Sequence, residues 1–439
     1  MPVKLEYVEP LKLYAVLREE NYPFILESLT RHELKARYTF LSSNPEFIIE
    51  IGEDTRIDGK RASSKKSPFQ ALKPYFNPLN SSYKFSGGFV GYVAYDAVHA
   101  YTGGRIEEKS CFGFYNHAFI YDHILNRFYY FSIRDSIEER KYAEKMVEKA
   151  KNREIEDEEG GSNIVNCDVG KEEFIEMVEK AKDYIFAGDA FQIVISREYR
   201  LKSDYSPFKI YRNIRKINPS PYMFLFEFEK AIAGASPETM ASVEKNVFKI
   251  NPIAGTTGRG KNEQEDEELA RHLLNDEKER AEHVMLVDLA RNDVRKVSRA
   301  GSVKVSRFFD VVKYSHVQHI ESEVIGELAD GRDAFDAMEA SFPAGTLTGA
   351  PKIRAMEIID ELEKSRRRVY GGAVGYFSLN CYADMAIAIR MVEIDNFCRV
   401  RAGAGIVADS NPEKEYYETE KKMAAVMKAL EVEHDIDNR

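Results

Sequence analysis

The chain has 439 residues, 44% of them hydrophobic and 12% aromatic, and carries a formal net charge of −10. This length exceeds what one hydrophobic core usually supports, so we expect two domains or one composite domain. The negative charge, which no basic tract offsets, argues against a nucleic-acid-binding protein. An anionic small substrate remains compatible with it, because a pocket responds to its own Arg, Lys and metal charges.

The sequence does not indicate secretion or membrane insertion. Residues 1–10 contain no apolar signal core, and no apolar run approaches the ~18 residues that would span a bilayer. The four cysteines are widely spaced and form no CxxC motif: Cys111, Cys167, Cys381 and Cys398. Because such thiols usually stay reduced inside cells, we expect a cytoplasmic protein with no membrane partner.

Residues 1–150 are predicted to form a strand-rich domain. Short β-branched and aromatic runs between turn-forming residues indicate strands at 47–51, 87–93 and 118–121. A charged helix is expected at 136–152. An acidic run closed by Gly-Gly-Ser at 160–162 follows, so residues 151–168 are predicted to be a linker to a second domain at 169–430.

The second domain is predicted to alternate helices with strands. A helix is expected at 172–186, and a strand at 190–196 places Gln192 and Ser196 on one face. A further strand is predicted at 221–228.

Two later strands carry polar groups on defined faces. Alternation at 314–320 places His316 and His319 on opposite faces, so only one of them can face a given pocket. From Asp384 to Arg390, apolar side chains alternate with small ones, which leaves a face with room for a ligand. The Arg390 guanidinium at its end suits bidentate binding of a carboxylate.

Residues 255–261 match the GxxxxGK spacing of a phosphate-binding loop but lack its chemistry. Asn262 stands where a Ser or Thr hydroxyl would bind Mg²⁺. The acids at 263 and 265–268 would begin the next helix, where they would repel a triphosphate. We therefore do not predict a nucleotide site here.

An acidic stripe follows the small residues Gly403 and Gly405. A helix is expected at 411–422, with Asn411 or Ser410 as its cap. One face of it carries residues at i, i+3 and i+7: Glu415, Glu418 and Lys422. For such a stripe alone, the alternative is a solvated helix face with an ordinary Glu–Lys pair.

A second helix, expected at 276–293, has the same spacing, since Glu279 and Glu282 lie at i and i+3. The apolar run that follows, at 284–289, is too hydrophobic for a fully exposed helix. If the two helices face each other, Glu282 and Glu418 can supply hard oxygen ligands for Mg²⁺. This ion takes one or two carboxylates, several waters and oxygens of an anionic substrate.

Six segments occur in the order found in the chorismate-utilising enzymes: SPET at 236–239, PIAGT at 252–256, EHVMLVDLARND at 282–293, FPAGTLTGAPK at 342–352, YGGAVGY at 370–376 and AGAGIVADS at 402–410. The chain resembles this family along nearly its whole length, most strongly over 170–427, and within it the branch that makes anthranilate. The resemblance implies an α+β chorismate-binding fold. In this fold two packed antiparallel sheets are flanked by helices in α/β/β/α layers, with two interwoven domains.

The resemblance also implies roles for single residues. Mg²⁺ would be held by Glu282 and Glu418, with Glu279 and Glu415 in support. The residues implied in catalysis are Glu238 as general acid for the leaving hydroxyl, His319 in the elimination, Thr346 and Gln192; His316 does not match the family's histidine. The residues implied to bind chorismate are Gly255, Thr256, Tyr370, Arg390, Gly403, Gly405 and Lys422.

Two positions distinguish the branches of this family. Relatives that make aminodeoxychorismate often carry a nucleophilic lysine where this chain has Ala254. Relatives that make isochorismate or salicylate carry a lysine base where it has Gln192. With neither amine present, ammonia is the remaining nucleophile, which indicates anthranilate and pyruvate as products. Aminodeoxychorismate synthesis and a catalytically silent amino-acid sensor are the alternatives.

The resemblance further implies a partner and an inhibitor. The chain has no glutaminase segment with a nucleophilic cysteine, so ammonia is expected from a separate glutamine amidotransferase subunit. Feedback inhibition by tryptophan is implied by eight residues that match the family's inhibitor site: Glu27, Ser28, Asn218, Pro221, Tyr222, Met223, Gly375 and Tyr376. Arg37 and Tyr38 match it less clearly, and ordinary packing is the alternative for the whole set.

Overall fold

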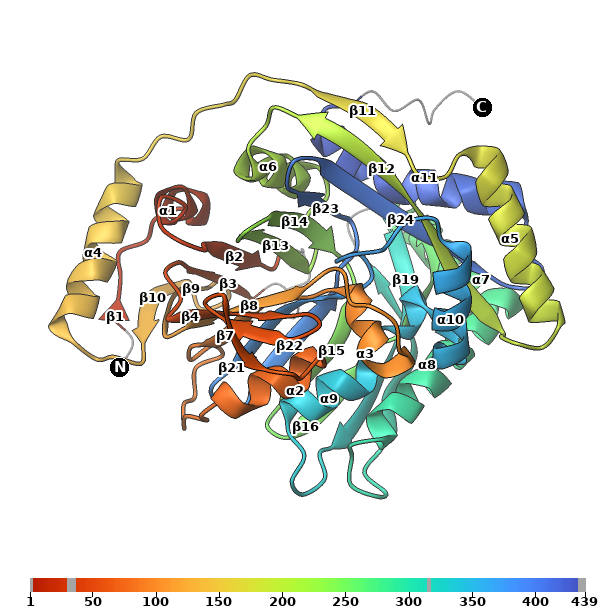
Figure 1. Cartoon of the computed structure of the whole chain (residues 1–439), viewed down its shortest axis with the longest axis horizontal. Coiled ribbons are helices and arrows are strands. Elements are labelled where there is room, and N and C mark those ends of the chain that lie inside the picture. Colours follow the sequence, from red (N-terminus) through yellow and green to blue (C-terminus); the bar gives the residue numbers. More distant parts are fainter. Residues whose placement is uncertain (1–2, 30–36, 314–316, 433–439) are drawn as a thin grey trace.

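The computed structural model describes residues 3–29, 37–313 and 317–432, without the side chains of Thr256 and Val317. Two antiparallel sheets of twelve strands each pack against one another, and helices cover their outer faces (Figure 1). This arrangement confirms the predicted α+β fold with α/β/β/α layers. His316 lies outside the described residues, so its orientation stays a prediction.

The first sheet has the following strands in spatial order: β1 (Val3–Lys4), β10 (Arg127–Ser132), β9 (His117–Asp122), β3 (Tyr38–Ser42), β2 (Phe24–Glu27), β13 (Tyr222–Glu227), β14 (Ala231–Ser236), β23 (Met391–Ile394), β24 (Cys398–Ile406), β12 (Gln192–Ser203) and β11 (Ser162–Cys167), with β20 (Gly349–Ala350) beside β12. The second sheet has this order: β17 (Ile253–Gly258), β19 (Val317–Glu327), β16 (Val247–Ile250), β15 (Thr239–Glu244), β22 (Tyr382–Ile387), β21 (Ala373–Ser378), β7 (Gly88–Val93), β8 (Ser110–Tyr115), β4 (Phe47–Ile51), β5 (Thr55–Ile57) and β6 (Lys60–Ser63), with β18 (Lys304–Lys313) beside β19.

The α-helices are α1 (Pro10–Leu17), α2 (Pro68–Leu72), α3 (His99–Thr102), α4 (Ile137–Lys151), α5 (Lys171–Phe186), α6 (Pro207–Ile217), α7 (Glu263–Asn275), α8 (Glu277–Arg295), α9 (Ala334–Ser341), α10 (Lys352–Leu362) and α11 (Pro412–Ala429). Three short 3₁₀ helices are η1 (Lys73–Tyr75), η2 (Tyr95–Val98) and η3 (Gly345–Leu347). In the described part of the chain, every helix is too short or too polar to cross a membrane.

Each sheet takes strands from both halves of the chain and has one seam between them. In the first sheet the seam is the β2–β13 pair, where Ile25 lies opposite Leu225. In the second sheet it is the β7–β21 pair, where Gly91 lies opposite Gly375. The two halves therefore share both sheets, as the interwoven arrangement predicts.

The core lies in three layers that follow the alternation of side chains along the strands. On β21, Val374 and Tyr376 pack between the sheets, whereas Ala373 and Phe377 pack under the helices of the second sheet. Buried aromatic rings such as Phe224 fill the space between the sheets. Burial of each large apolar side chain contributes about 1.5–3 kcal/mol, so this layer holds the two sheets together.

The predicted linker at 151–168 is wrong in its last part. Residues 162–167 form β11, an edge strand that pairs with β12. Gly160 and Gly161 directly precede this strand, and Ser162 is its first residue. The error arises because strand pairing joins segments far apart in sequence, which local composition does not report.

The alternation predicted from Asp384 to Arg390 holds only as far as Ile387, where β22 ends. The chain then leaves the second sheet and enters β23 of the first sheet at Met391. Arg390 adopts a left-handed backbone conformation, with φ 51°, at this crossing. Its side chain is therefore placed by the connection between the sheets and not by a strand face.

The GxxxxGK segment forms the end of β17 and a turn into α7. Asn262 caps α7 by accepting a hydrogen bond from the Glu265 amide at 3.0 Å. The Gly260 amide, which a phosphate would need, donates to the Asp266 carboxylate at 2.6 Å. Arg259 also pairs with Asp266. The loop thus satisfies its own polar groups with an acid of the same segment.

Candidate active site

Side-chain caps fix the starts of the two acidic helices. The Asp276 carboxylate accepts a hydrogen bond from the Glu279 amide at 3.0 Å at the start of α8. The Asn411 side chain accepts one from the Lys414 amide at 3.0 Å at the start of α11. Such caps satisfy otherwise unpaired amides, so each helix begins at a defined residue and its acids lie in defined turns.

The acids of α8 and α11 approach one another. Burial raises the pKa of Glu282, and the charges of Glu279 and, from the other helix, Glu415 raise it further. Burial also raises the pKa of Glu279, with added effects of Asp276 and of Glu418 across the gap. Like charges influence each other in this way only at short range. The two stripes therefore act on one another electrostatically, and their convergence on one metal site stays a prediction.

Lys422 pairs directly with one acid of this region. Its ammonium lies 3.1 Å from a Glu418 oxygen and donates to the Gly403 carbonyl at 3.0 Å. Burial raises the pKa of Glu418, but Lys422 outweighs this effect, so the pKa lies below its ordinary value. Burial and Glu418 together raise the pKa of Glu415. Lys278 lowers the pKa values of Glu279, Glu282 and Glu415, but burial and the neighbouring acids outweigh it, so these three pKa values stay raised.

Glycines let the strands approach these side chains closely. Gly255 on β17 has φ 65°, and a methyl group there would come within 3.0 Å of a Glu279 oxygen. At Gly405 on β24, a methyl group would come within 2.5 Å of the Gln192 amide nitrogen. Any larger residue at either position would displace a predicted site residue.

Glu238 follows β14 and faces η3. The Thr346 hydroxyl donates to its carboxylate at 2.8 Å. Burial raises the pKa of Glu238 to about 7, although Thr346, Lys422 and Arg390 each lower it. A carboxyl group with this pKa is protonated in part at neutral pH and is suited to give up a proton.

Arg390 lies among the same groups. One of its terminal nitrogens donates to the Lys422 carbonyl at 2.8 Å. Burial lowers the pKa of the Arg390 guanidinium, while Tyr370, Glu418 and Glu238 oppose this effect. The Tyr370 ring lies beside β24, since a methyl group at Gly403 would come within 3.2 Å of its hydroxyl. A buried guanidinium next to a tyrosine hydroxyl can bind a carboxylate.

His319 and Gln192 complete the wall of the site. Because a carbonyl only accepts, the His319 Nδ1 carries the proton in its 3.0 Å hydrogen bond to Gly255. His319 lies opposite Thr256 across β17 and β19; the Thr256 side chain is outside the described part of the structure. Among the described residues, the buried Gln192 Oε1 has no hydrogen-bond partner.

The donor set suits Mg²⁺ only in combination with other ligands. Within residues 3–29, 37–313 and 317–432, no group of three or more His, Cys, Asp or Glu side chains is placed to hold a metal alone. Mg²⁺ commonly takes only one or two carboxylates and completes its shell with water and substrate oxygens. Glu282, which is partly buried, and Glu418, which is about half exposed, could supply two such carboxylates.

A separate cavity of about 760 Å³ lies between the two sheets. Seven of the eight residues predicted for an inhibitor site line it: Glu27, Ser28, Pro221, Tyr222, Met223, Gly375 and Tyr376. Asn218 is not among the lining residues; its amide ends α6 by donating to Ile214 at 2.8 Å. Arg37 and Tyr38 do line the cavity.

The sequence analysis did not identify two polar residues of this cavity. The Tyr222 hydroxyl contacts the Thr239 hydroxyl at 2.8 Å and donates to Asp384 at 3.1 Å. Asp384 lies on the predicted small-residue face of its strand. A carboxylate on that face is the sequence signal that could have identified it as a cavity residue. Thr239 directly follows Glu238, so the cavity reaches the residue next to the proposed acid.

Replacing Thr346 with Val removes the hydroxyl that stabilises the charged form of Glu238. We expect the pKa of Glu238 to rise from about 7 by roughly half to one pH unit, as for a hydrogen bond worth about 1 kcal/mol. An NMR titration of ¹³C-labelled glutamate carboxyls measures this. Thr348→Val is the control, because the Thr348 hydroxyl donates to Ala344 at 3.0 Å. An equal shift in both variants would contradict the assignment.

Known proteins share both the sequence and the fold. The family model of chorismate binding enzymes matches residues 22–428. Anthranilate synthase component 1 of Thermococcus kodakarensis is 60% identical, over 98% of this chain and all of the relative. Anthranilate synthase component 1 of Archaeoglobus fulgidus is 53% identical, over 97% of this chain and 99% of the relative. The crystal structure of anthranilate synthase component I from Streptococcus pneumoniae is 35% identical, covers 89% of this chain and 92% of its own, and has a TM-score of 0.80. The chain therefore belongs to the chorismate-binding enzyme family and groups within it with anthranilate synthase component 1.

Proposed function

We propose that this protein converts chorismate and ammonia into anthranilate and pyruvate in the presence of Mg²⁺. The observation that carries the proposal is that acids of α11 raise the pKa values of Glu279 and Glu282 on α8, while Glu238, with a pKa of about 7, is affected by Lys422 and Arg390 of the same region. The names of the relatives that are 53% and 60% identical support the same activity.

Chorismate is a dianion, and the site has two regions that suit its two carboxylates. Arg390 and the Tyr370 hydroxyl would bind the carboxylate of the enolpyruvyl side chain. Lys422, Gly405 and the β17 backbone at 255–256 would surround the ring carboxylate. Glu282 and Glu418 would hold Mg²⁺ next to that carboxylate, where the ion neutralises its charge and assists addition to the ring.

Glu238 is placed to act as the general acid. Its proton passes to the ring hydroxyl as the C–O bond breaks, so that water leaves, while the lone pair of ammonia forms the new C–N bond. Thr346 keeps the carboxyl oriented through its 2.8 Å hydrogen bond. His319, which donates from Nδ1 to Gly255, would take up the ring proton through its other nitrogen as pyruvate leaves and the ring becomes aromatic.

Two further residues favour ammonia as the nucleophile. Gln192 cannot act as a base towards water, but its buried Oε1 can accept a hydrogen bond from ammonia. Ala254 provides no amine for a covalent intermediate. We propose that a glutamine amidotransferase subunit supplies the ammonia, in agreement with the word component in the names of the relatives.

The product identifies the reaction. Incubation with chorismate, Mg²⁺ and ammonium at alkaline pH should give fluorescent anthranilate and one equivalent of pyruvate. Addition of glutamine and an amidotransferase partner should replace the need for ammonium. Formation of 4-amino-4-deoxychorismate, isochorismate or salicylate would contradict the proposal. Tryptophan binding without any turnover would favour the silent sensor.

Removal of one ligand should disable the metal site but not the fold. In Glu282→Gln and Glu418→Gln we expect Mg²⁺ affinity to fall by about 10–100-fold and turnover to be lost at moderate Mg²⁺. Isothermal titration with Mg²⁺ and chorismate measures the affinity, and circular dichroism checks the fold. Glu413→Gln, which lies on the same helix and pairs with Lys171 at 2.5 Å, is the control. Full activity in both ligand variants would refute the assignment.

We also propose that tryptophan binds in the cavity between the sheets and inhibits the reaction. The seven lining residues support this, as does the Tyr222–Thr239 contact that leads to Glu238. Leu26 lines the same cavity, so Leu26→Trp should fill it and weaken inhibition at least tenfold with little change in kcat. Ile137→Trp, at an exposed position, should keep normal inhibition. Equal sensitivity in the two variants would place the inhibitor elsewhere.

A further inference from the structure

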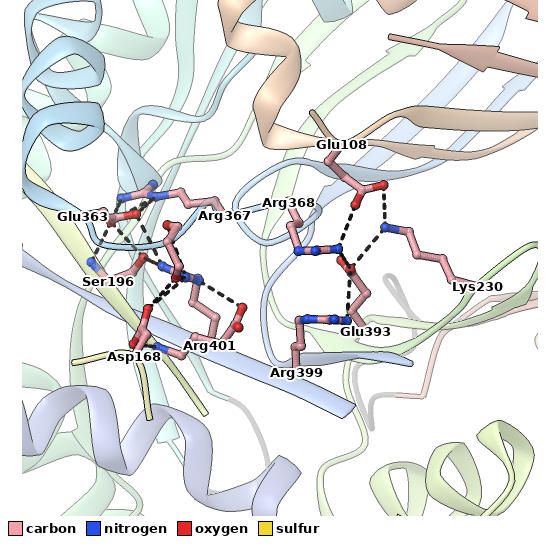
Figure 2. A network of polar contacts seen from close by, with 12 residues as sticks. Glu108, Asp168, Ser196, Lys230, Glu363, Arg367, Arg368, Glu393, Arg399 and Arg401 are labelled. Atoms are coloured by element: carbon pink, nitrogen blue, oxygen red, sulfur yellow. Dashed lines mark hydrogen bonds and ion pairs between the residues drawn. The ribbon is translucent and has the colours of Figure 1, made fainter. Parts of the chain in front are cut away.

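Two groups of ionic side chains lie near one another beside β12, β23 and β24 (Figure 2). We call the first the Glu363 cluster: Asp168, Ser196, Glu363, Ser365, Arg367 and Arg401. We call the second the Glu393 cluster: Glu108, Lys230, Arg368, Glu393 and Arg399. Neither cluster contains a residue assigned to the reaction. The Glu363 cluster includes an arginine that donates to main-chain carbonyls of η3 and β12.

Arg367 uses all three of its guanidinium nitrogens. Nη1 donates to the Leu347 carbonyl at 2.6 Å, and Nη2 donates to the Val194 carbonyl at 2.7 Å. Nε and Nη2 also donate to the Glu363 carboxylate, at 3.0 and 2.6 Å. The guanidinium lies 4.6 Å from the centre of the Tyr95 ring. The Arg367 side chain is 1% exposed, and these partners fix its position.

Glu363 extends the contact to two more strands. Its carboxylate accepts hydrogen bonds from the Ser196 amide and hydroxyl, both at 2.8 Å, on β12. It also lies 3.4 Å from a nitrogen of Arg401 on β24. Arg401 in turn donates to the Ser196 hydroxyl at 3.0 Å. The pair thus joins η3, β12 and β24, which are distant in sequence.

Each segment held in this way carries a proposed site residue within a few positions. Val194 and Ser196 follow Gln192 on β12, and Leu347 follows Thr346 directly. Arg401 precedes Gly403 on β24. Arg367 itself accepts a hydrogen bond from the Tyr370 amide at 3.0 Å. The ion pair therefore contacts three of these segments, and the main-chain carbonyl of Arg367 holds the fourth. The residues so placed are Gln192, Thr346, Gly403 and Tyr370.

Stability does not explain this arrangement. Burying an ion pair usually costs about as much free energy as its attraction returns, and apolar replacements are often equally stable. The two carbonyl contacts fix a distance between β12 and η3, which an apolar side chain cannot do. In a preorganised site, a displacement of about 1 Å can reduce the rate by ~10²-fold.

We propose that Arg367, paired with Glu363, is a positioning residue that holds Gln192 and Thr346 at the correct separation on either side of chorismate. This inference rests on the proposed function. Lysine cannot replace it, because one ammonium nitrogen would have to serve the two carbonyls and the carboxylate that three nitrogens serve in arginine.

The test compares Arg367→Lys with Arg399→Lys. Arg399 is a buried arginine of the Glu393 cluster on β24, and its side chain bonds Asp395 at 2.7 Å instead of the carbonyls of β12 and η3. In Arg367→Lys we expect kcat to fall by ~10²-fold while KM for chorismate changes by less than about threefold. The reason is that Arg390 and Lys422 bond other partners, and the main-chain bond that holds Tyr370 is retained in the variant. Arg399→Lys should keep kcat and lose only thermal stability. Glu363→Gln replaces Arg367→Lys if that variant does not fold.

Amide hydrogen exchange provides a readout that does not need turnover. Exchange at 192–196 and 345–348 should be faster in Arg367→Lys and unchanged in Arg399→Lys. The proposal is overturned if both variants lose kcat in proportion to their melting temperatures, or if Arg367→Lys keeps normal kcat and normal exchange. If the wild-type protein makes no anthranilate, the proposed function fails, and the exchange rates still decide whether Arg367 positions these segments.

Discussion

The central constraint on this structure is the crowding of four carboxylates from two helices. Burial and neighbouring acids raise the pKa values of Glu279, Glu282 and Glu415 although Lys278 opposes this effect, and only Glu418, paired with Lys422, has a lowered pKa among the four. Buried like charges are unfavourable unless a cation or a proton offsets them. A divalent cation and an anionic substrate relieve this repulsion together, so metal and substrate binding should depend on each other.

The packing of the two sheets produces this crowding. α8 packs on the second sheet through Val287 and Val294, whereas α11 packs on the first sheet through Met423 and Met427. The two helices therefore belong to different layers, and acids of α11 raise the pKa values of acids on α8. The same packing leaves the cavity between the sheets, and Tyr222 connects that cavity to the strand that follows Glu238.

Local patterns in the sequence predicted the parts of the site that depend on local structure. Helix caps and i, i+3 spacing identified both acidic stripes, and strand alternation predicted the faces of β22 up to Ile387. What the sequence could not provide was long-range pairing, such as β11 with β12. The crossing at Arg390 and the bonds of Arg367 to Leu347 and Val194 were likewise not predictable, because their partners are distant in the chain.

The most direct test of this account is a crystal structure with Mn²⁺ in place of Mg²⁺, measured at a wavelength where manganese scatters anomalously. The account predicts one anomalous peak between α8 and α11, within about 2–2.5 Å of Glu282 and Glu418 oxygens. It predicts that chorismate raises the occupancy of this peak. A peak elsewhere, or four glutamates that point into separate regions of solvent with no ion between them, would contradict it.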